Sequence, residues 1–234
     1  MLEIEKFSVT YPDKTQAIKD ISLWVNNDES VALIGANGAG KTSLIMALVG
    51  ILPSVGNVTV DGIKLEKKTL NLIRSKIGVV FQNPDDQLFM SSIYEDIAFG
   101  LRNMAMGEDE ISLAIDKCLD RLNIMKLKDK TALKLSGGEK RMVAIATVLV
   151  MEPSIMIFDE PTAFLDPKAR RNLINTLNSF SHTKLVATHD IAFAAETCKR
   201  TVLIKDGSIF AEGLSEDILY DKELMDRCGV EAIG

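Results

Sequence analysis

Residues 35 to 42 carry the clearest chemical motif in the chain. They read Gly-Ala-Asn-Gly-Ala-Gly-Lys-Thr and match the pattern GxxxxGK[ST]. Glycines let backbone N–H groups approach phosphate oxygens, and the start of a helix adds a positive dipole end. Apolar residues 31–34 before the motif predict a buried strand, and the periodic residues 44–52 after it predict a helix. A nucleotide-binding loop is therefore expected, formed by Gly35, Ala36, Asn37, Gly38, Ala39, Gly40, Lys41, Thr42 and Ser43.

Two acids end a second segment that suits phosphate chemistry. Residues 154–160 read Ser-Ile-Met-Ile-Phe-Asp-Glu, an apolar run that predicts a buried strand followed by Asp159 and Glu160. An acid at the end of such a strand can hold Mg²⁺ beside a phosphate loop, and we assign this role to Asp159. Neighbouring strand residues point in opposite directions, so Glu160 is placed to orient or deprotonate an attacking water. Together the two segments predict an ATPase.

The remaining sequence predicts the elements that position these residues. Alternating apolar and polar residues predict antiparallel strands at 2–9, 18–25 and 57–61. Residues 91–150 show helical spacing. Short continuous apolar runs are typical of strands buried on both faces, and they cover 31–34, 77–81, 155–158, 185–188 and 202–204. We therefore expect an α/β fold with a mostly parallel core sheet, an antiparallel β edge and a helical subdomain.

The length of the chain suits one large α/β domain. It has 234 residues, and neither an internal repeat nor a low-complexity linker divides it. We expect a single ATPase domain over 1–234, with a core of about 1–83 and 151–234 and a helical subdomain of about 84–150. Open α/β sheets bind ligands at the carboxyl ends of their strands, where both acidic and glycine-rich segments are predicted to lie.

Composition and charge exclude several functional classes. The formal net charge is −6, which argues against a protein that coats nucleic acid. Cys118, Cys198 and Cys228 are widely spaced and odd in number, as expected of buried or incidental thiols in a reducing compartment. The longest apolar run, residues 142–151, is about half of the roughly 20 residues that a membrane span requires. Any attachment to a membrane is therefore expected to come through a partner.

Residues 135–139, Leu-Ser-Gly-Gly-Glu, resemble the LSGGQ signature of ABC ATPases. A serine can cap the helix that starts there, and the two glycines can expose backbone N–H groups to an anion. The resemblance covers about residues 2–217 and implies the ABC-type nucleotide-binding fold of P-loop NTPases, with ATP and Mg²⁺ as ligands. In this family the signature contacts the γ-phosphate of ATP on a second subunit, so the resemblance implies a homodimer or heterodimer. The expected cross-subunit contacts are Ser136, Gly137, Gly138 and Glu139.

Four further residues match functional positions of the same family. Tyr11 is similar to the aromatic residue that stacks on adenine. Gln82 is similar to the glutamine that links Mg²⁺ and the attacking water to the helical subdomain. Asp166 is similar to the aspartate of a loop that crosses the dimer interface in this family, and His189 is similar to a histidine that senses the γ-phosphate. The resemblance thus implies catalytic roles for Glu160, Gln82 and His189, and metal contacts from Thr42, Gln82 and Asp159.

Three positions depart from the usual family pattern. Ala36 stands where proline is common. Thr42 and Ser43 invert the usual Ser-Thr order, which keeps a hydroxyl after Lys41. Phe164 stands where a small residue is usual in the interface loop, which bears on packing across the dimer.

Residues 81–89, Phe-Gln-Asn-Pro-Asp-Asp-Gln-Leu-Phe, look like the same segment in ATPases of energy-coupling-factor and cobalt or nickel uptake systems. This resemblance implies an importer of a transition metal ion or a vitamin, integral membrane subunits as partners, and a peripheral position on the cytoplasmic face of the plasma membrane. The chain is expected to lack the longer C-terminal domain of many relatives, as short forms in cobalt, nickel and biotin systems do. We also expect a docking surface for a basic, apolar-faced helix of a membrane subunit, with acids Asp85, Asp86 and Glu95 as its rim. Its apolar residues are expected among Leu88, Phe89, Met90, Ile93, Tyr94 and Phe99, part of which must belong to the ordinary core.

Three other functions fit the sequence less well. Another ABC importer or an exporter is the nearest alternative, and residues 83–87 argue against it. ABC-type ATPases of DNA repair and translation carry insertions or two ATPase domains, for which this chain has no room, and we expect no nucleic-acid partner. A non-hydrolysing binding module would be expected to lose Glu160 or His189, and both are present.

Overall fold

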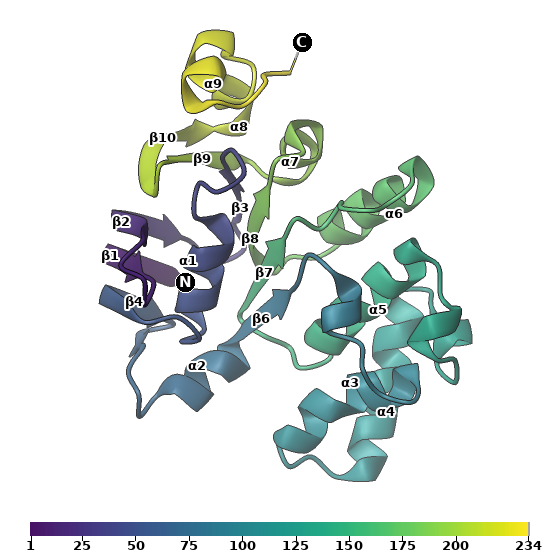
Figure 1. Ribbon diagram of the computed structural model, residues 1–234. Helices are drawn as coiled ribbons and strands as arrows, with labels where there is room; N and C mark the ends of the chain where they lie inside the picture. The colour runs from purple at the N-terminus through teal and green to yellow at the C-terminus, as the bar shows by residue number, and fades with distance from the viewer. Residues whose placement is uncertain (234) are drawn as a thin grey trace.

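The computed structural model describes residues 1–233, and its centre is a six-stranded sheet (Figure 1). The strand order is β10-β9-β3-β8-β7-β6, and all neighbours are parallel except β10 and β9. Every residue of β7 and β8 is buried, as expected for central strands covered on both faces. The strands are β3 (Ser30–Ile34), β6 (Ile77–Val80), β7 (Ile155–Asp159), β8 (Thr183–Thr188), β9 (Arg200–Lys205) and β10 (Ser208–Leu214).

A second sheet of four antiparallel strands is built from the N-terminal part of the chain. Leu2 and Ile4 are buried while Glu5 is exposed, so β1 alternates between a core face and a solvent face. Pairing fixes the register, with Leu2 opposite Val25 on one side and Val60 on the other. The strands are β1 (Leu2–Thr10), β2 (Gln16–Val25), β4 (Ser54–Val60) and β5 (Ile63–Lys64), in the order β2-β1-β4-β5.

Helix α1 (Lys41–Leu48) lies between the two sheets (Figure 1). Its residues Leu44, Ile45 and Leu48 are buried in the same apolar cluster as the inner faces of both sheets. Burial of a leucine or isoleucine side chain contributes about 1.5–3 kcal/mol. The core therefore fixes the helix that follows the glycine-rich loop, because a shift of this helix would disrupt its apolar packing.

The remaining helices pack around the core sheet. Helix α5 contacts α3, α4, α6 and β6, and it forms the centre of the helical region shown in teal (Figure 1). Among residues 1–233, none of the helices combines the length and the apolar character needed to cross a bilayer. The helices are α2 (Leu70–Lys76), α3 (Ile93–Asn103), α4 (Glu108–Arg121), α5 (Gly137–Leu149), α6 (Pro167–Asn178), α7 (Ile191–Thr197), α8 (Ser215–Ile218) and α9 (Lys222–Cys228), with short 3₁₀ turns η1 (Pro84–Asp86), η2 (Met125–Leu127) and η3 (Ala132–Lys134).

The predicted fold class is confirmed, and several predicted boundaries are wrong, two of them by three residues at the start of the element. The helix expected over 44–52 spans 41–48, because Gly40 takes a left-handed φ of 105° and begins the helix directly after itself. The strand expected from residue 57 begins at Ser54, which pairs with Val9. Residues 54–57 are all exposed, so the first part of this strand has no alternation of buried and exposed residues by which the sequence could have indicated it.

All three cysteines are buried as free thiols. Burial raises the pKa of the Cys118 thiol to about 11 and that of the Cys198 thiol to about 12. The pKa of Cys228 is raised by burial as well. Because the thiolate is the reactive form, the three side chains behave as small apolar core groups, as the sequence predicted.

Candidate nucleotide site

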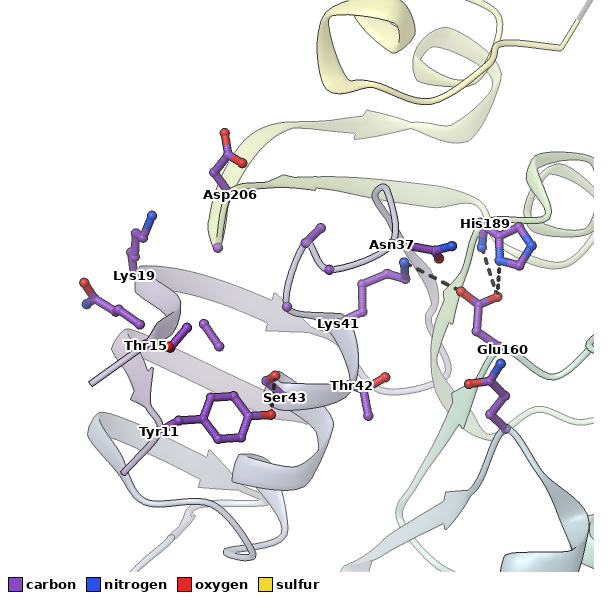
Figure 2. Close-up of a pocket in the computed structure, with 17 residues that line it drawn as sticks. Tyr11, Thr15, Lys19, Asn37, Lys41, Thr42, Ser43, Glu160, His189 and Asp206 are labelled. Atoms are coloured by element: carbon purple, nitrogen blue, oxygen red, sulfur yellow. Dashed lines mark hydrogen bonds and ion pairs between the residues drawn. The ribbon is translucent and has the colours of Figure 1, made fainter. Parts of the chain in front are cut away.

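A cavity of about 490 Å³ opens at the carboxyl end of the core sheet (Figure 2). Its walls come from segments that lie far apart in the sequence. They are the turn between β1 and β2, the loop before α1, and the ends of β6, β7, β8 and β9. The lining residues are Tyr11, Thr15, Gln16, Ala17, Lys19, Asn37, Gly38, Ala39, Gly40, Lys41, Thr42, Ser43, Gln82, Glu160, His189, Asp206 and Gly207.

The glycine-rich loop forms the floor of this cavity. Gly38 and Gly40 have φ angles of 84° and 105°, a region that glycine enters without steric cost. The buried Lys41 side chain folds back along the loop, and its ammonium donates to the carbonyl of Gly35 at 2.7 Å and that of Ala36 at 3.4 Å. The loop therefore offers backbone N–H groups and a fixed cation, and such groups bind the oxygens of a phosphate chain.

Asp159, the last residue of β7, faces the start of α1. Its Oδ2 accepts a hydrogen bond of 2.8 Å from the hydroxyl of Thr42. Its Oδ1 is buried and finds no hydrogen-bond partner among residues 1–233. Burial raises the pKa of the Asp159 carboxyl, while the Thr42 hydrogen bond opposes the rise. An orphaned carboxylate oxygen next to a hydroxyl is a donor set that fits Mg²⁺, which prefers oxygen ligands.

Glu160 follows Asp159, and its side chain lines the cavity next to Lys41. Its backbone has a left-handed φ of 43°, which is uncommon for a residue with a Cβ. Its Oε1 lies 3.6 Å from the ammonium of Lys41. Its Oε2 accepts from the Thr188 hydroxyl at 3.0 Å and the His189 backbone N–H at 3.1 Å, and the His189 Nδ1 lies 2.9 Å away (Figure 2). The buried carboxylate is thus held in one orientation.

The opposite end of the cavity is formed by residues of the antiparallel sheet. The hydroxyl of Tyr11 and the Oγ of Ser43 are 2.9 Å apart, which fixes the tyrosine ring at the cavity wall (Figure 2). Sequence reasoning missed Thr15, Lys19 and Asp206 on this wall. They come from the β1–β2 turn, the start of β2 and the β9–β10 turn, none of which carries a motif, and only the packing of the two sheets brings them to the loop.

Gln82 reaches the cavity from the end of β6, and its backbone is held by α5. Arg141 donates from Nη1 to the carbonyl of Phe81 and from Nη2 to that of Gln82, both at 2.6 Å. Burial lowers the pKa of the Arg141 guanidinium to about 10, and the nearby Asp159 opposes this change. The guanidinium is still charged near neutral pH. Sequence reasoning missed Arg141, whose partners are about sixty residues away.

The signature segment lies outside this cavity. Ser136 caps α5, with its hydroxyl accepting from the Glu139 N–H at 3.3 Å. Glu139 Oε2 accepts in return from the Ser136 N–H at 3.0 Å, and this backbone hydrogen bond lowers the pKa of Glu139. Asp166 likewise caps α6 by accepting from the Ala169 N–H at 2.8 Å. The structure therefore separates Ser136, Gly137, Gly138, Glu139 and Asp166 from the phosphate loop of their own chain.

The comparisons with known proteins agree on one family. Residues 18–163 match the family model described as ABC transporter. A putative ABC transporter ATP-binding protein of Geobacter sulfurreducens is 41% identical over 232 residues, which covers 99% of this chain and 93% of that protein. An energy-coupling factor transporter ATP-binding protein of Methanothermobacter thermautotrophicus is 40% identical, with 98% of this chain and 76% of that protein covered.

Solved structures give the same result. A Clostridium perfringens protein described as part of the ABC transporter complex cbiONQ superposes with a TM-score of 0.86 at 38% identity, covering 97% of this chain and 93% of that one. A dimeric ATP-binding cassette in a post-hydrolysis state, bound to ADP and Pi, gives a TM-score of 0.82 at 28% identity, covering 92% and 99%. Fold, cavity and relatives lead to one conclusion: the chain is an ATPase of the ABC transporter family.

Proposed function

We propose that this chain hydrolyses ATP at composite sites, each formed by two ABC ATPase subunits. The supporting observation is the position of Ser136, which starts α5 outside the cavity that contains Lys41 of the same chain. A second chain, identical or related, is therefore needed to bring a signature segment to the nucleotide. The proposed unit is one ATPase domain with a core of about 1–83 and 151–234 and a helical subdomain of about 84–150.

Each group around the cavity has a proposed part in hydrolysis. Tyr11 stacks on the adenine, and Lys41 with the loop N–H groups binds the β- and γ-phosphates. Glu160 accepts the proton of the attacking water, a role that its fixed and buried carboxylate favours. His189 is the proposed contact to the γ-phosphate, a role supported by its place in the cavity wall and by a side chain that is 62% exposed.

Thr42, Gln82 and Asp159 are the proposed holders of Mg²⁺. The unpartnered Oδ1 of Asp159 and the adjacent Thr42 hydroxyl support this assignment. When bound, the ion neutralises negative charge on the phosphates. The protein's own contribution is to keep the Asp159 carboxylate buried and hydrogen-bonded from one side, which leaves its second oxygen for the metal.

We further propose that hydrolysis powers an importer of the energy-coupling-factor type, for a transition metal ion or a vitamin. Relatives carrying the energy-coupling factor name, at 40% and 39% identity, support this assignment. The structural relative from the complex cbiONQ supports it too. The chain would sit on the cytoplasmic face of the plasma membrane, attached peripherally through integral membrane subunits.

The proposed contact with a membrane subunit is centred on two phenylalanines. Phe89 and Phe99 are 63% and 43% exposed, and their rings meet edge to face with centroids 5.4 Å apart. Of the six apolar residues considered for this surface, Leu88 and Ile93 belong to the core, because both face the cluster around α5. The proposed apolar surface is the remaining part, with Met90 and Tyr94 half-buried.

The acidic rim expected around this surface is largely neutralised within the chain. Asp85 pairs with Lys140 at 2.6 Å, and Glu95 pairs with Arg102 at 2.5 Å. Asp96 has a different role, since its Oδ1 accepts from the backbone N–H groups of Phe89 and Met90, both at 2.9 Å. Two exposed aromatic rings beside internally paired acids thus favour an apolar partner over the strongly basic helix expected from the sequence.

Co-expression with the membrane subunits tests this function. The double variant Phe89→Ser/Phe99→Ser is expected to bind ATP normally and to be lost from the affinity-purified complex. Leu113→Ser is the matched control, because Leu113 on α4 is also 63% exposed. Undiminished recovery of the double variant would contradict the docking surface. ATP-dependent uptake of Co²⁺, Ni²⁺ or a vitamin into proteoliposomes that contain the complex then identifies the cargo class, and the absence of all three would refute the importer assignment.

A further inference from the structure

Arg141 is the largest fully buried side chain in the part of the chain that the structure describes, with 1% of its surface exposed. It lies in the second turn of α5, a helix that begins just after Ser136. A buried cation is costly unless its donors find partners. Its Nη1 and Nη2 have partners in two carbonyls at 2.6 Å, while Nε has none within residues 1–233.

Both carbonyls belong to the short segment between β6 and η1. In addition, the Phe81 N–H donates to Gln87 Oε1 at 3.2 Å. The amide nitrogen of Gln87 then donates back to α5, to the carbonyl of Ala144 at 2.9 Å and the hydroxyl of Thr147 at 2.8 Å. The backbone of Phe81 and Gln82 is therefore fastened to α5, while the Gln82 side chain lines the nucleotide cavity.

We propose that Arg141 is a positioning residue for ATP hydrolysis, which holds Gln82 in register with α5 so that the Gln82 amide reaches the reacting end of the nucleotide. The inference rests on the proposed role of Gln82. It also gives α5 a mechanical role. In the proposed dimer Ser136 would face the site of the second subunit, and Arg141, about 7.5 Å further along the helix axis, holds a residue of the chain's own site. A shift of α5 at one site thus moves Gln82 at the other.

A purely structural role for Arg141 predicts a different outcome, and the chain offers a matched control. Lys184 is also a buried cation that donates to two carbonyls, those of Leu177 at 3.0 Å and Phe180 at 2.7 Å. These partners lie at the end of α6 and just beyond it, outside the nucleotide cavity. If burial and hydrogen bonding were the whole role of Arg141, Lys184→Met and Arg141→Met would have similar consequences.

The test is a double-mutant cycle on the full chain, in which kcat, nucleotide affinity and the melting temperature are measured. Arg141→Met is expected to lower kcat about tenfold or more while the Kd of a fluorescent ATP analogue changes less than about twofold. In a Gln82→Ala background, the same replacement is expected to lower kcat less than about twofold further, because the residue through which it acts is gone. Arg141→Lys retains a donor and is expected to recover part of kcat. Lys184→Met is expected to lower the melting temperature and leave kcat within about twofold.

Several results would overturn the proposal. An equal loss of kcat in the two backgrounds would show that Arg141 does not act through Gln82, and so would an unchanged kcat in Arg141→Met. A normal kcat in Gln82→Ala alone would show that Gln82 is not needed for hydrolysis, so Arg141 could not act through it. Should Arg141→Met fail to fold, Arg141→Lys is compared in both backgrounds under the same criteria. The Glu160→Gln variant tests the assignment of the hydrolytic site separately. The role of Arg141 and the assignment of the hydrolytic site can therefore be refuted independently.

Discussion

The ammonium of Lys41 lies 3.6 Å from Oε1 of Glu160, and both side chains are buried. Opposite charges at this distance attract strongly where water is excluded. The second oxygen of Glu160 is held by Thr188 and by the backbone of His189. The carboxylate is thus anchored through both oxygens, and its charge can be removed without removing all of its hydrogen bonds.

Glu160→Gln is expected to lower kcat by about 10²- to 10⁴-fold, the usual scale for a positioned base. The amide oxygen can still accept from Thr188 and His189, and removal of a negative charge beside the phosphates favours ATP binding. We therefore expect wild-type or tighter ATP affinity and an accumulation of ATP-bound dimer, both measurable by equilibrium binding and size-exclusion chromatography. Turnover near the wild-type value would contradict the assignment of Glu160 as the general base.

Lys41→Ala is expected to weaken ATP binding by roughly 10- to 100-fold, because a hydrogen bond to a charged group contributes about 1.5–3 kcal/mol. Titration with a fluorescent ATP analogue measures this loss. Lys19→Ala is the comparison, since Lys19 lines the same cavity but comes from β2, on the side of Tyr11 (Figure 2). Equal affinity of wild type and Lys41→Ala would refute the phosphate-loop assignment.

Mixing two inactive variants tests the composite site. In a dimer of one Lys41→Ala chain and one Ser136→Arg chain, one site carries both changes and the other carries neither. We expect ATPase activity to return in part when the purified variants are mixed. A mixture that stays inactive, although native mass spectrometry shows the mixed dimer, would speak against a site shared in this way.

The buried carboxylate of Asp96 predicts a pH dependence of stability. Burial raises the pKa of Asp96, so the group favours folding at low pH, and this contribution is lost as pH rises through the raised folded-state pKa. Asp96→Asn can still accept from the N–H groups of Phe89 and Met90 but carries no charge. The unfolding free energy of Asp96→Asn minus that of the wild type is therefore expected to increase with pH above about 4.

Urea unfolding at several pH values measures this difference directly. The rise should level off once the wild-type carboxyl is fully ionised. A difference that is the same at every pH between 4 and 8 would contradict the raised pKa.

The sequence was sufficient for the features that depend on local pattern. Runs such as residues 155–158 identified central strands because a strand buried on both faces must be apolar throughout. The glycine-rich loop could be singled out because phosphate binding fixes residue type and spacing together. Tyr11, Thr42, Gln82, Glu160 and His189 line one cavity, and the roles that the resemblance implies for them stay predictions.

What the sequence could not supply were contacts between distant segments. Nothing near Arg141 indicates that its guanidinium reaches the carbonyl of Gln82, because that contact depends on how α5 packs beside β6. For the same reason, the sequence did not show that Leu88 and Ile93 are the core members of the apolar cluster over residues 88–99. Apolar residues lie on more than one face of the helical region, and only the packing around α5 decides which of these residues are buried.

The burial of all three thiols makes the folded chain convenient for site-directed spectroscopy. Labelling reagents attack the thiolate, and Cys118, Cys198 and Cys228 are both buried and weakly acidic. A cysteine introduced in place of Leu133, which is 92% exposed close to Ser136, would then be the one readily labelled position. Interspin distances between two copies labelled there could follow the approach of the signature segments during turnover, with no native cysteine removed.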